Sequence, residues 1–493
     1  MSLEEDILSQ RLARVKQIEA LGFKPYGHRF DFTHTLAQVR RQYGARDREE
    51  LERDPVTVRV CGRIQTIRRM GKAGFAHLAQ EGERLQIYVR RDNVPAEHFT
   101  LYKKLLDIGD IIGVEGRLFR TKTNELSVMA EKLYFLSKTL LNMPEKWHGL
   151  EDVETRYRQR YLDLIANPEV RRVFLTRARI IGSFRRQLES RGFLEVETPM
   201  MQPVYGGATA RPFITHHNAL NIDLYLRIAP ELYLKRLVIG GLERVYEINR
   251  NFRNEGISTQ HNPEFTMLEA YQAYADYEDM MELFEALVCH AAQKSIGTLN
   301  ITYQGRQINL SPPWRRLPML EAIKQYAGID LTPEEDVVAQ AVEKLDIEVE
   351  GEQTFEAVLN KVFDRYVEPE LIQPTFITDF PTAISPLAKQ KPDRPELVDR
   401  FEPFVGGLEI GNAFSELNDP LEQRKRFEAQ VQARAAGDEE AHPMDEDFLR
   451  ALEYGMPPCG GLGLGVDRLV MLLTDQASLR EVIFFPHLRP EKR

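Results

Sequence analysis

VYEINRNFRNEGISTQHNPEFTMLEAY, residues 245–271, contains two strand-like runs on either side of a polar loop. Arg253 and Glu255 stand two residues apart, which would place them on one face of the first strand. The second run repeats with the same period, and one face of it carries Phe265, Met267, Glu269 and Tyr271. An antiparallel hairpin would therefore present a cation, aromatic rings and carboxylates on one surface.

This mixture of side chains favours a ligand-binding surface over a core face. An unpaired charge buried in a core costs several kcal/mol, roughly, so a core strand would not carry Arg253, Glu255 and Glu269 on its inner side. A solvated face is the alternative, but it would expose large apolar side chains next to the charges.

Length and composition limit the number of domains and the class of protein. A chain of 493 residues is expected to hold two to four domains of roughly 150 residues each. Hydrophobic residues make up 43% and charged residues 28%, which is typical of a soluble globular protein. No window approaches the ~20 apolar residues of a membrane span, and the acidic, amphipathic N-terminus does not resemble a signal peptide. We therefore expect a cytoplasmic protein with no membrane association.

Cysteines and charge exclude further classes. Cys61, Cys289 and Cys459 lie far apart, which argues against a disulfide framework or a zinc ribbon and suits a reducing compartment. The net charge of −10 gives no general attraction to nucleic acid, so RNA binding would need locally gathered basic residues.

Residues 55–138 read as five short strands with one helix after the third, which is the order of an OB-fold. OB-folds bind single-stranded nucleic acid with aromatic side chains and a basic rim. The candidates for such contacts are Phe75, Gln86, Arg63, Arg68, Arg69 and Lys72. The alternative is a small barrel with an ordinary charged surface.

Two later stretches carry further candidate site residues. In residues 400–416 a glutamate recurs every seven positions, at Glu402, Glu409 and Glu416. Prolines and glycines between them exclude a helix, so a strand would need a bulge to direct all three carboxylates to one pocket. Residues 459–473 run from a glycine-rich strand into a helix. The usual glycine patterns of nucleotide-binding folds are absent from the chain.

The remaining segments define the domain organisation. A helix is predicted near the N-terminus, a linker runs into a helix after residue 139, and an amphipathic helix followed by a strand covers 169–201. Residues 276–400 are predicted to hold an inserted helical subdomain. We therefore predict an α+β protein with two domains, 1–145 and 146–493.

The motifs resemble those of class II aminoacyl-tRNA synthetases. Phe252-Arg253-x-Glu255, a loop, and His261-x-x-x-Phe265 are similar to the second motif of that family, and Gly463-x-Gly465-x-Asp467-Arg468 is similar to the third. The helix, strand and proline of residues 169–201 are similar to the first, which forms a two-fold interface in the family and so implies a homodimer. The resemblance implies an OB-fold anticodon-binding domain followed by a catalytic domain built on an antiparallel sheet flanked by helices.

Within this family the chain is most similar to the bacterial lysyl-tRNA synthetases. Four stretches carry that similarity, and they are residues 229–235, the glycine loop of 205–211, residues 264–271 and residues 411–419. The resemblance implies ATP-dependent activation of L-lysine to lysyl-adenylate, with transfer to the 3′ end of tRNA(Lys). The alternatives are an aspartate- or asparagine-charging relative, and a paralogue that lysylates a protein or only binds RNA. An aspartate pocket would need a cation at its side-chain end, and no arginine or lysine is expected there.

The resemblance also implies a role for individual residues. A lysine pocket must pair a buried ammonium with a carboxylate and hydrogen-bond acceptors. The implied lysine-binding residues are Gly207, Glu231, Arg253, Glu269, Tyr271, Asn412, Phe414 and Glu416. The implied ATP-binding residues are Arg253, Glu255, His261, Phe265, Glu409 and Arg468, with Arg253 and Arg468 assisting catalysis. Glu402 and Glu409 are expected to bind Mg²⁺.

In the OB-fold domain, the residues implied to read the central anticodon base are Phe75, Gln86 and Glu125. The family usually carries Thr-Gly-Glu-Leu where this chain has Thr123-Asn124-Glu125-Leu126. Asparagine also tolerates the left-handed backbone conformation, so we expect the turn to be retained.

Overall fold

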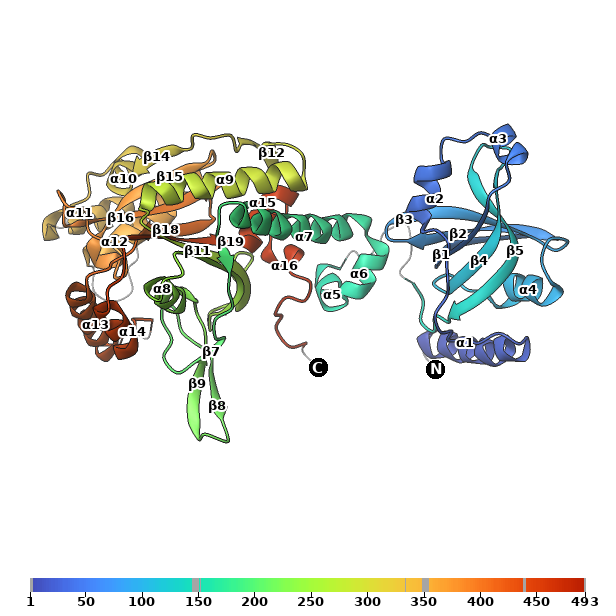
Figure 1. Cartoon of the computed structure of the whole chain (residues 1–493), viewed down its shortest axis with the longest axis horizontal. Helices are drawn as coiled ribbons and strands as arrows, with labels where there is room; N and C mark the ends of the chain where they lie inside the picture. The colour runs from blue at the N-terminus through green and yellow to red at the C-terminus, as the bar shows by residue number, and fades with distance from the viewer. Residues whose placement is uncertain are drawn as a thin grey trace. The chain divides into compact units, whose positions relative to one another are not determined.

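The structure is a computed structural model that describes residues 3–143, 150, 152–332, 334–347, 354–437 and 440–491. The chain divides into two compact units, residues 1–171 and 172–493, which are described separately (Figure 1). The domain boundary that we predict near residue 145 lies outside the described residues, because 144–149 are not among them.

The first unit contains a closed five-stranded barrel. Its strands follow the order β1-β2-β3-β5-β4 around the barrel, and they are β1 (Thr57–Met70), β2 (Ala73–Gln80), β3 (Glu83–Arg90), β4 (Ile111–Arg120) and β5 (Leu126–Ser137). Helix α4 (Ala96–Thr100) lies between β3 and β4. Alternate residues such as Val58, Val60 and Ile87 fill the interior, as the period of two requires. The predicted OB-fold is confirmed.

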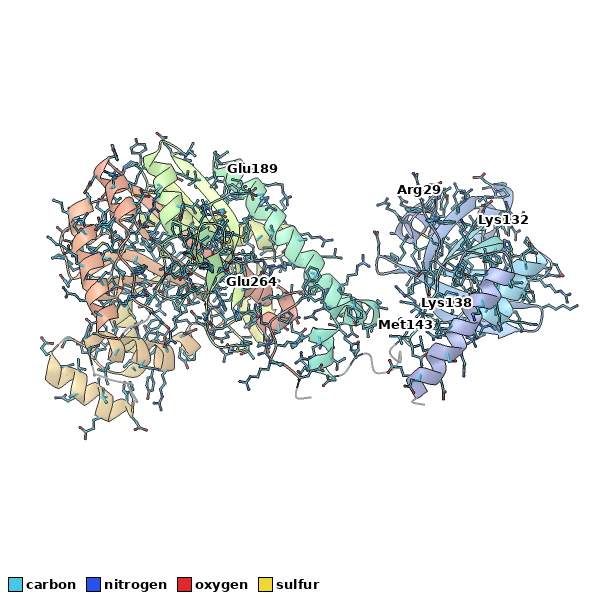
Figure 2. All side chains as sticks on the ribbon, turned by 90° about the horizontal axis from the view of Figure 1, so that it is seen from below. Arg29, Lys132, Lys138, Met143, Glu189 and Glu264 are labelled. Carbon is cyan, nitrogen blue, oxygen red and sulfur yellow. The ribbon has the colours of Figure 1, made fainter. Side chains whose placement is uncertain are left out.

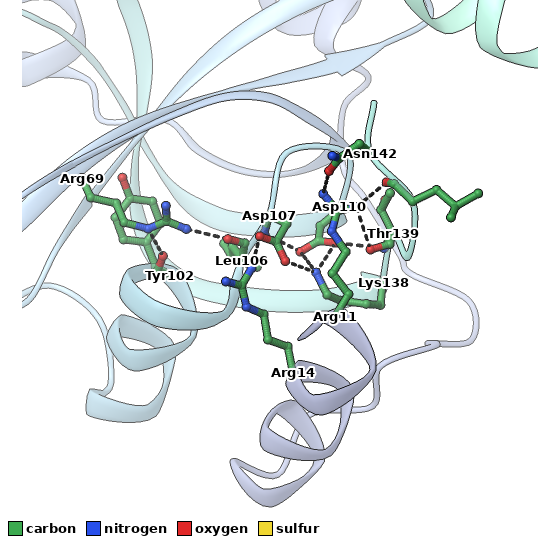
Figure 3. Close-up of polar contacts among 11 residues, drawn as sticks. Arg11, Arg14, Arg69, Tyr102, Leu106, Asp107, Asp110, Lys138, Thr139 and Asn142 are labelled. Carbon is green, nitrogen blue, oxygen red and sulfur yellow. Dashed lines mark hydrogen bonds and ion pairs between the residues drawn. The ribbon is translucent and has the colours of Figure 1, made fainter. Parts of the chain in front are cut away.

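A buried polar cluster fastens helix α1 (Leu3–Ala20) to the barrel (Figure 3). The Lys138 ammonium is fully buried and lies 2.6 Å from an Asp107 oxygen and 2.9 Å from an Asp110 oxygen. From α1, Arg14 pairs with Asp107, and Arg11 donates to the Thr139 carbonyl at 3.1 Å. Two short helices, α2 (Leu36–Tyr43) and α3 (Arg48–Arg53), lie between α1 and β1 in the chain.

The second unit is built on one large, mostly antiparallel sheet. Its strand order is β14-β15-β16-β18-β19-β11-β10-β6, with β17 paired to β16. The strands are β6 (Leu194–Glu195), β10 (Arg244–Phe252), β11 (Glu264–Ala273), β14 (Arg315–Pro318), β15 (Thr375–Pro381), β16 (Leu397–Val405), β17 (Leu408–Glu409), β18 (Gly411–Ser415) and β19 (Cys459–Gly465). This arrangement confirms the predicted antiparallel sheet flanked by helices.

Helices cover both faces of this sheet. Helices α7 (Pro168–Glu189), α9 (Tyr277–Ser295) and α15 (Val466–Thr474) bury their apolar stripes in the main core, which contains Phe184, Phe284 and Leu469. On the other face a smaller core joins the helices α8 (Glu231–Ile239), α13 (Pro420–Ala435) and α14 (Glu446–Glu453) to the strands. Two further helices, α5 (Val153–Arg158) and α6 (Arg160–Ala166), precede α7 in the chain.

The segment 276–400 is not purely helical, so the prediction of a helical insertion needs correction. Helices α10 (Met319–Ala327), α11 (Glu335–Leu345) and α12 (Phe355–Val362) do share a core of their own. However, α9 packs in the main core, β12 (Asn300–Tyr303) pairs with β13 (Arg306–Asn309), and β14 and β15 extend the main sheet. β12, β13 and β14 have four residues each, too few for their alternation to stand out in the sequence, whereas the sequence does predict a strand at β15.

The predicted strand near Pro199 is divided. Proline cannot donate to a ladder, and only β6 and β7 (Met201–Gln202) form on either side of it. Strand β7 joins β9 (Ile222–Leu226) and β8 (Ile214–His217) in a small sheet, whose hairpin projects away from the main sheet (Figure 1). Within the described ranges, no helix is both long and apolar enough to cross a membrane.

Candidate active site

The hairpin of β10 and β11 forms as predicted, with Asn251 opposite Phe265 and Phe252 opposite Glu264. Glu264, where β11 begins, is labelled among the side chains in Figure 2. Strand β10 ends at Phe252, so Arg253 and Glu255 lie in the loop that follows it. The prediction that both residues lie on the first strand is therefore wrong. The Arg253 amide still donates to the Pro263 carbonyl at 2.9 Å. Its guanidinium lies 5.1 Å from the centroid of the Phe265 ring, so the cation and the ring stay side by side.

One cavity of about 470 Å³ lies against this hairpin. All the residues that we expect to bind lysine, ATP or Mg²⁺ line it, and they are Gly207, Glu231, Arg253, Glu255, His261, Phe265, Glu269, Tyr271, Glu402, Glu409, Asn412, Phe414, Glu416 and Arg468. Residues from widely separated parts of the chain therefore meet at one place.

The three glutamates spaced by seven reach this cavity by a different route from the one we expected. Glu402 lies on β16, Glu409 on β17, and Glu416 directly after β18. The chain reverses between β16 and β17 at Gly406 and Gly407, whose φ angles of 66° and 75° favour glycine. A sharp turn, and not a bulge within one strand, brings the carboxylates together.

One end of the cavity is acidic and closed to solvent. Glu231, Glu269 and Glu416 are all buried, and the Tyr271 hydroxyl donates to Glu269 at 3.1 Å. Burial, reinforced by the charge of Glu231, raises the pKa of Glu269 to about 8. Burial also raises the pKa of Glu416 and of Glu231 above the usual value for a glutamate, although a neighbouring lysine opposes both shifts. This end can accept positive charge.

That neighbouring lysine is Lys235, which the sequence analysis missed. Its ammonium is fully buried, lies 2.7 Å from Glu231 Oε1, and pairs with Glu416. It also lies 5.4 Å from the centroid of the Phe414 ring. The expectation that no cation stands at this end was therefore wrong. Glu231 and Lys235 are four residues apart on α8, a spacing that brings helical side chains together and was visible in the sequence.

The other end of the cavity is rich in arginine. Arg468 donates to Glu409 Oε2 at 3.0 Å and to the Glu409 carbonyl at 2.6 Å. Arg400, a second residue that the sequence analysis missed, donates to Glu402 Oε1 at 2.6 Å and to Asn412 Oδ1 at 3.0 Å. These arginines hold the carboxylates and the amide in fixed positions.

The position of Arg468 is itself fixed by the helix that carries it. Asp467 accepts a hydrogen bond from the Thr266 amide of β11 at 2.8 Å and from Arg177 of α7 at 2.5 Å. The first turn of α15, which carries Arg468, is thereby tied to the strand that carries Phe265 and Glu269.

Strand β19 forms the floor of the acidic end. Gly461 lies opposite Tyr271 on β11 and opposite Phe414 on β18. A Cβ atom at position 461 would lie 1.9 Å from Glu416 Oε1 and 2.6 Å from Tyr271 Cε1. Only glycine leaves room for the carboxylate and the ring at this position.

His442 also lines the acidic end and was not anticipated. It is buried beside Phe427, and burial together with the Lys235 charge lowers its pKa to about 4. A neutral imidazole therefore adds no positive charge to this part of the cavity at neutral pH.

The described residues contain no group of three or more His, Cys, Asp or Glu side chains that could hold a metal ion alone. Glu402 and Glu409 nevertheless suit Mg²⁺, a cation that takes carboxylate oxygens together with substrate phosphates and water. Arg400 and Arg468 each hold one oxygen of these carboxylates, which leaves the other oxygen as a ligand.

Of the three candidate anticodon-binding residues in the barrel, Phe75 lies on β2, Gln86 on β3, and Glu125 directly before β5. Gln86 donates to Glu125 at 2.9 Å, and the Phe75 ring centroid is 4.7 Å from that of Tyr88. His77, which the sequence analysis missed, lies 3.1 Å from Glu125. Asn124 adopts a φ of 63°, so the expected left-handed turn is confirmed.

A second cavity, of about 780 Å³, is lined by Phe75, Tyr88 and Phe119 in this unit. Two arginines of the predicted basic rim donate to backbone carbonyls, and the rim itself stays a prediction. Arg63 donates to the Gly109 carbonyl at 2.8 Å, and Arg69 donates to the Leu106 carbonyl at 2.5 Å (Figure 3). Lys72 lines the cavity.

Two protein-family models match the chain, and several named proteins are similar to it over its full length. The model of "tRNA synthetases class II (D, K and N)" matches residues 152–489, and that of "OB-fold nucleic acid binding domain" matches residues 58–136. A protein of Moorella thermoacetica named lysine–tRNA ligase is 57% identical to this chain, with 100% of this chain and 99% of the relative covered. Relatives of the same name from Pelotomaculum thermopropionicum and Bacillus subtilis are 56% and 53% identical, over 99% and 98% of this chain and 96% and 97% of their own lengths.

Proposed function

Because the chain belongs to the class II aminoacyl-tRNA synthetases, and within them to the lysine–tRNA ligases, we propose a role for each group of side chains in the cavity. The enzyme uses ATP to join lysine to tRNA. Full-length relatives carry the lysine name, so neither the aspartate- or asparagine-charging alternative nor the protein-lysylating paralogue is favoured.

The acidic end binds the amino acid. The observation that carries this proposal is the burial of Glu231, Glu269 and Glu416 around one end of the cavity. Glu416 and Tyr271 would bind the ε-ammonium group of lysine, with Glu269 beside them and Phe414 along the aliphatic chain. Glu231 and the Gly207 backbone would bind the α-ammonium group, while Arg253 and Asn412 would bind the carboxylate.

The arginine-rich end binds ATP. Phe265 offers a ring on which adenine stacks, and the Arg253 guanidinium above it would reach the α-phosphate. Arg468 and His261 would hold the outer phosphates, with Glu255 as a further contact to the nucleotide. In this arrangement the α-phosphate would lie next to the lysine carboxylate.

Activation needs no protein nucleophile. A carboxylate oxygen of lysine attacks the α-phosphorus in line, a new oxygen–phosphorus bond forms, and pyrophosphate leaves with the electrons of the broken bond. Arg253 stabilises the charge that develops on the α-phosphate, and Arg468 stabilises the leaving pyrophosphate. A hydroxyl of the terminal ribose of tRNA then attacks the carbonyl carbon of the adenylate, and AMP leaves.

Glu402 and Glu409 would hold Mg²⁺ through carboxylate oxygens. When bound, the ion neutralises phosphate charge and orients the phosphate chain. The arginine contacts occupy Glu402 Oε1 and Glu409 Oε2, so the other oxygen of each carboxylate would bind the ion.

The barrel recognises the anticodon. Phe75 would stack on the central base, and Gln86 and Glu125 would read its polar edge, which is supported by the Gln86–Glu125 hydrogen bond of 2.9 Å. We place the boundary between this domain and the catalytic domain near residue 145. The cognate RNA would be tRNA(Lys), and the enzyme would act in the cytoplasm.

The catalytic unit would form a homodimer through the surface that follows α7. Several consecutive elements carry exposed apolar side chains, namely Leu175 on α7, Leu194 on edge strand β6, Met201 on β7, and Ile214 and Ile222 on the projecting hairpin. A succession of exposed apolar residues is typical of an interaction surface. Self-association would cover them.

Pyrophosphate exchange with ATP, measured with each of the common amino acids, tests the proposed function. Lysine alone should support exchange, and Arg253→Ala should abolish it. Exchange supported by aspartate or asparagine would overturn the assignment of the acidic end. Exchange retained in Arg253→Ala would remove that guanidinium from the α-phosphate.

A further inference from the structure

Lys235 lies beside the cavity and is not among the residues that line it, yet it places a cation against two carboxylates that are proposed to bind a cation. Its side chain is fully buried, and its ammonium contacts Glu231 Oε1 at 2.7 Å and also pairs with Glu416. Among the described residues, Lys235 is the one cation that forms an ion pair with either of these two glutamates. One ammonium thus joins the carboxylate proposed for the α-amino group to the one proposed for the ε-amino group.

The helix that carries Lys235 is held rigidly. Leu234 and Val238, its neighbours on α8, are buried in the smaller core. The next residue, Arg236, pairs with Asp445 of α14 at 2.9 Å. The backbone that carries Lys235 is therefore fixed, and its ammonium is held by the two carboxylates.

Charge balance explains why a cation is needed here. Three buried carboxylates in one apolar pocket cannot all stay ionised without compensation, because burial and mutual repulsion both favour protonation. Lysine brings two ammonium groups into this end of the cavity, and its own carboxylate lies toward Arg253. One internal cation therefore leaves the three glutamates matched to the two ammonium groups of the substrate.

We propose that Lys235 is a positioning residue for the amino-acid substrate, which keeps Glu231 and Glu416 ionised and fixes their separation before lysine binds. This inference rests on the proposed assignment of the acidic end. Buried ion pairs are often replaceable by apolar side chains without loss of stability, so folding alone does not demand this one.

Other titratable or charged groups surround the pair and would share in any shift of its titration. They are Glu269 and Tyr271 on β11, Arg400 on β16, Cys459 on β19, and His442 before α14. His442 is neutral at neutral pH, so it does not replace the charge of Lys235.

Three substitutions at this position separate charge from shape. Lys235→Met removes the charge and the hydrogen-bond donors, Lys235→Gln keeps donors without charge, and Lys235→Arg keeps the charge. The measurement is pyrophosphate exchange as a function of pH, with lysine and then ATP as the varied substrate. The full-length enzyme is used throughout.

Without the cation, Glu231 and Glu416 gain protons at higher pH and cease to bind ammonium groups. Lys235→Met and Lys235→Gln should therefore raise the KM for lysine at pH 7 and leave the KM for ATP unchanged. The acid limb of kcat/KM for lysine should move upward by about one pH unit or more, an approximately tenfold loss on the limb. Lys235→Arg should restore the limb.

Lys138→Met provides a matched control, because Lys138 is an equally buried lysine between two aspartates, in the barrel (Figure 3). It should lower Tm and leave the acid limb in place. Comparison of Lys235→Met/Glu416→Gln with Glu416→Gln keeps the test open if Lys235→Met alone fails to fold, since the double variant removes both members of the pair. Because Lys235 also pairs with Glu231, the double variant should have a KM for lysine above that of Glu416→Gln, by a smaller factor than loss of the lysine causes in the otherwise unaltered enzyme.

The proposal fails if the acid limb stays in place in both Lys235→Met and Lys235→Gln, or if the KM values for lysine and ATP rise together. It also fails if the effects of Lys235→Met and Glu416→Gln simply add. Failure of the proposed function is a different result, because the unaltered enzyme would then show no exchange with lysine at any pH.

Discussion

Glu269 shows how burial prepares a single side chain for its ligand. Its carboxyl lies in the acidic end of the cavity with the charge of Glu231 nearby, and only the Tyr271 hydroxyl donates a hydrogen bond to it within the described residues. A pKa of about 8 means that this carboxyl is mostly protonated at neutral pH while the pocket holds no lysine.

This pKa predicts a pH-dependent affinity for lysine. An ammonium group favours the ionised carboxylate, so binding lowers the pKa of Glu269 and releases a proton. The affinity should therefore rise as the pH increases from about 6 to about 8, and then level off above the pKa of the free enzyme. Calorimetry in buffers of different ionisation enthalpy measures the released proton. A dissociation constant that stays flat over this range, or a steep one that persists in Glu269→Gln, would contradict the assignment.

Glu416→Gln tests the partner of the ε-ammonium group. Removing a fully desolvated charge from an ion pair costs about 3–5 kcal/mol, so the KM for lysine should rise by roughly 10² to 10³ or more, with the KM for ATP unchanged. Glu446→Gln is the matched control, because Glu446 pairs with Arg424 on the solvent-exposed surface. An unchanged KM for lysine with lost turnover would instead link Glu416 to the metal.

The strands determine where these side chains meet. β18, β19 and β11 lie next to one another, and the residues facing the cavity are Asn412 and Phe414 on the first, Gly461 and Gly463 on the second, and Glu269 and Tyr271 on the third. The central strand contributes glycines on that face and buries Leu462 and Leu464 on the other. The cavity exists because the middle strand has no side chains to fill it.

Gly461→Ala should therefore damage lysine binding specifically. The new methyl group would overlap Glu416 Oε1 and the Tyr271 ring, and both would have to move. We expect a raised KM for lysine, a smaller effect on ATP, and a lower Tm. Gly71→Ala, where an added Cβ meets no atom within 4 Å, is the control and should leave both KM values unchanged. Normal lysine kinetics in Gly461→Ala would show that the floor of the pocket lies elsewhere.

The aromatic side chains of the barrel should affect only the tRNA-dependent step. Phe75→Ala removes a stacking surface worth roughly 1–3 kcal/mol, so charging of tRNA should fall by about 5-fold to 150-fold while pyrophosphate exchange is unchanged. Phe32→Ala, at an exposed aromatic residue of the same unit, is the control. Equal losses in exchange and charging would place Phe75 in the barrel core.

Over the whole molecule, the sequence predicts local secondary structure well and contacts between distant residues poorly. The alternation of Phe265, Met267, Glu269 and Tyr271 on β11 depends only on the period of a strand, and it is confirmed. The OB-fold is likewise confirmed by the closed barrel of five strands, with a helix between the third and the fourth. The resemblance to the family motifs also implied every residue that we propose to bind lysine, ATP or Mg²⁺ in the cavity.

Two classes of residue were not predictable from these patterns. Lys235 and Arg400 each contact one site residue close in sequence, at spacings of four (Glu231) and two (Glu402). Their contacts with Glu416 and Asn412 form only in the folded chain. The glutamates of residues 400–416 were read along one strand, whereas a glycine turn divides them between strands. Charge pairing across the fold appears only when the strands are assembled.

A crystal structure of the enzyme with lysine and a non-hydrolysable ATP analogue would locate both substrates in the cavity. We expect the ε-ammonium group beside Glu416 and Tyr271, adenine against Phe265, and the α-phosphate within hydrogen-bonding distance of Arg253. Lysine bound outside the acidic end, or a nucleotide that leaves Phe265 and Arg253 without contact, would contradict this expectation.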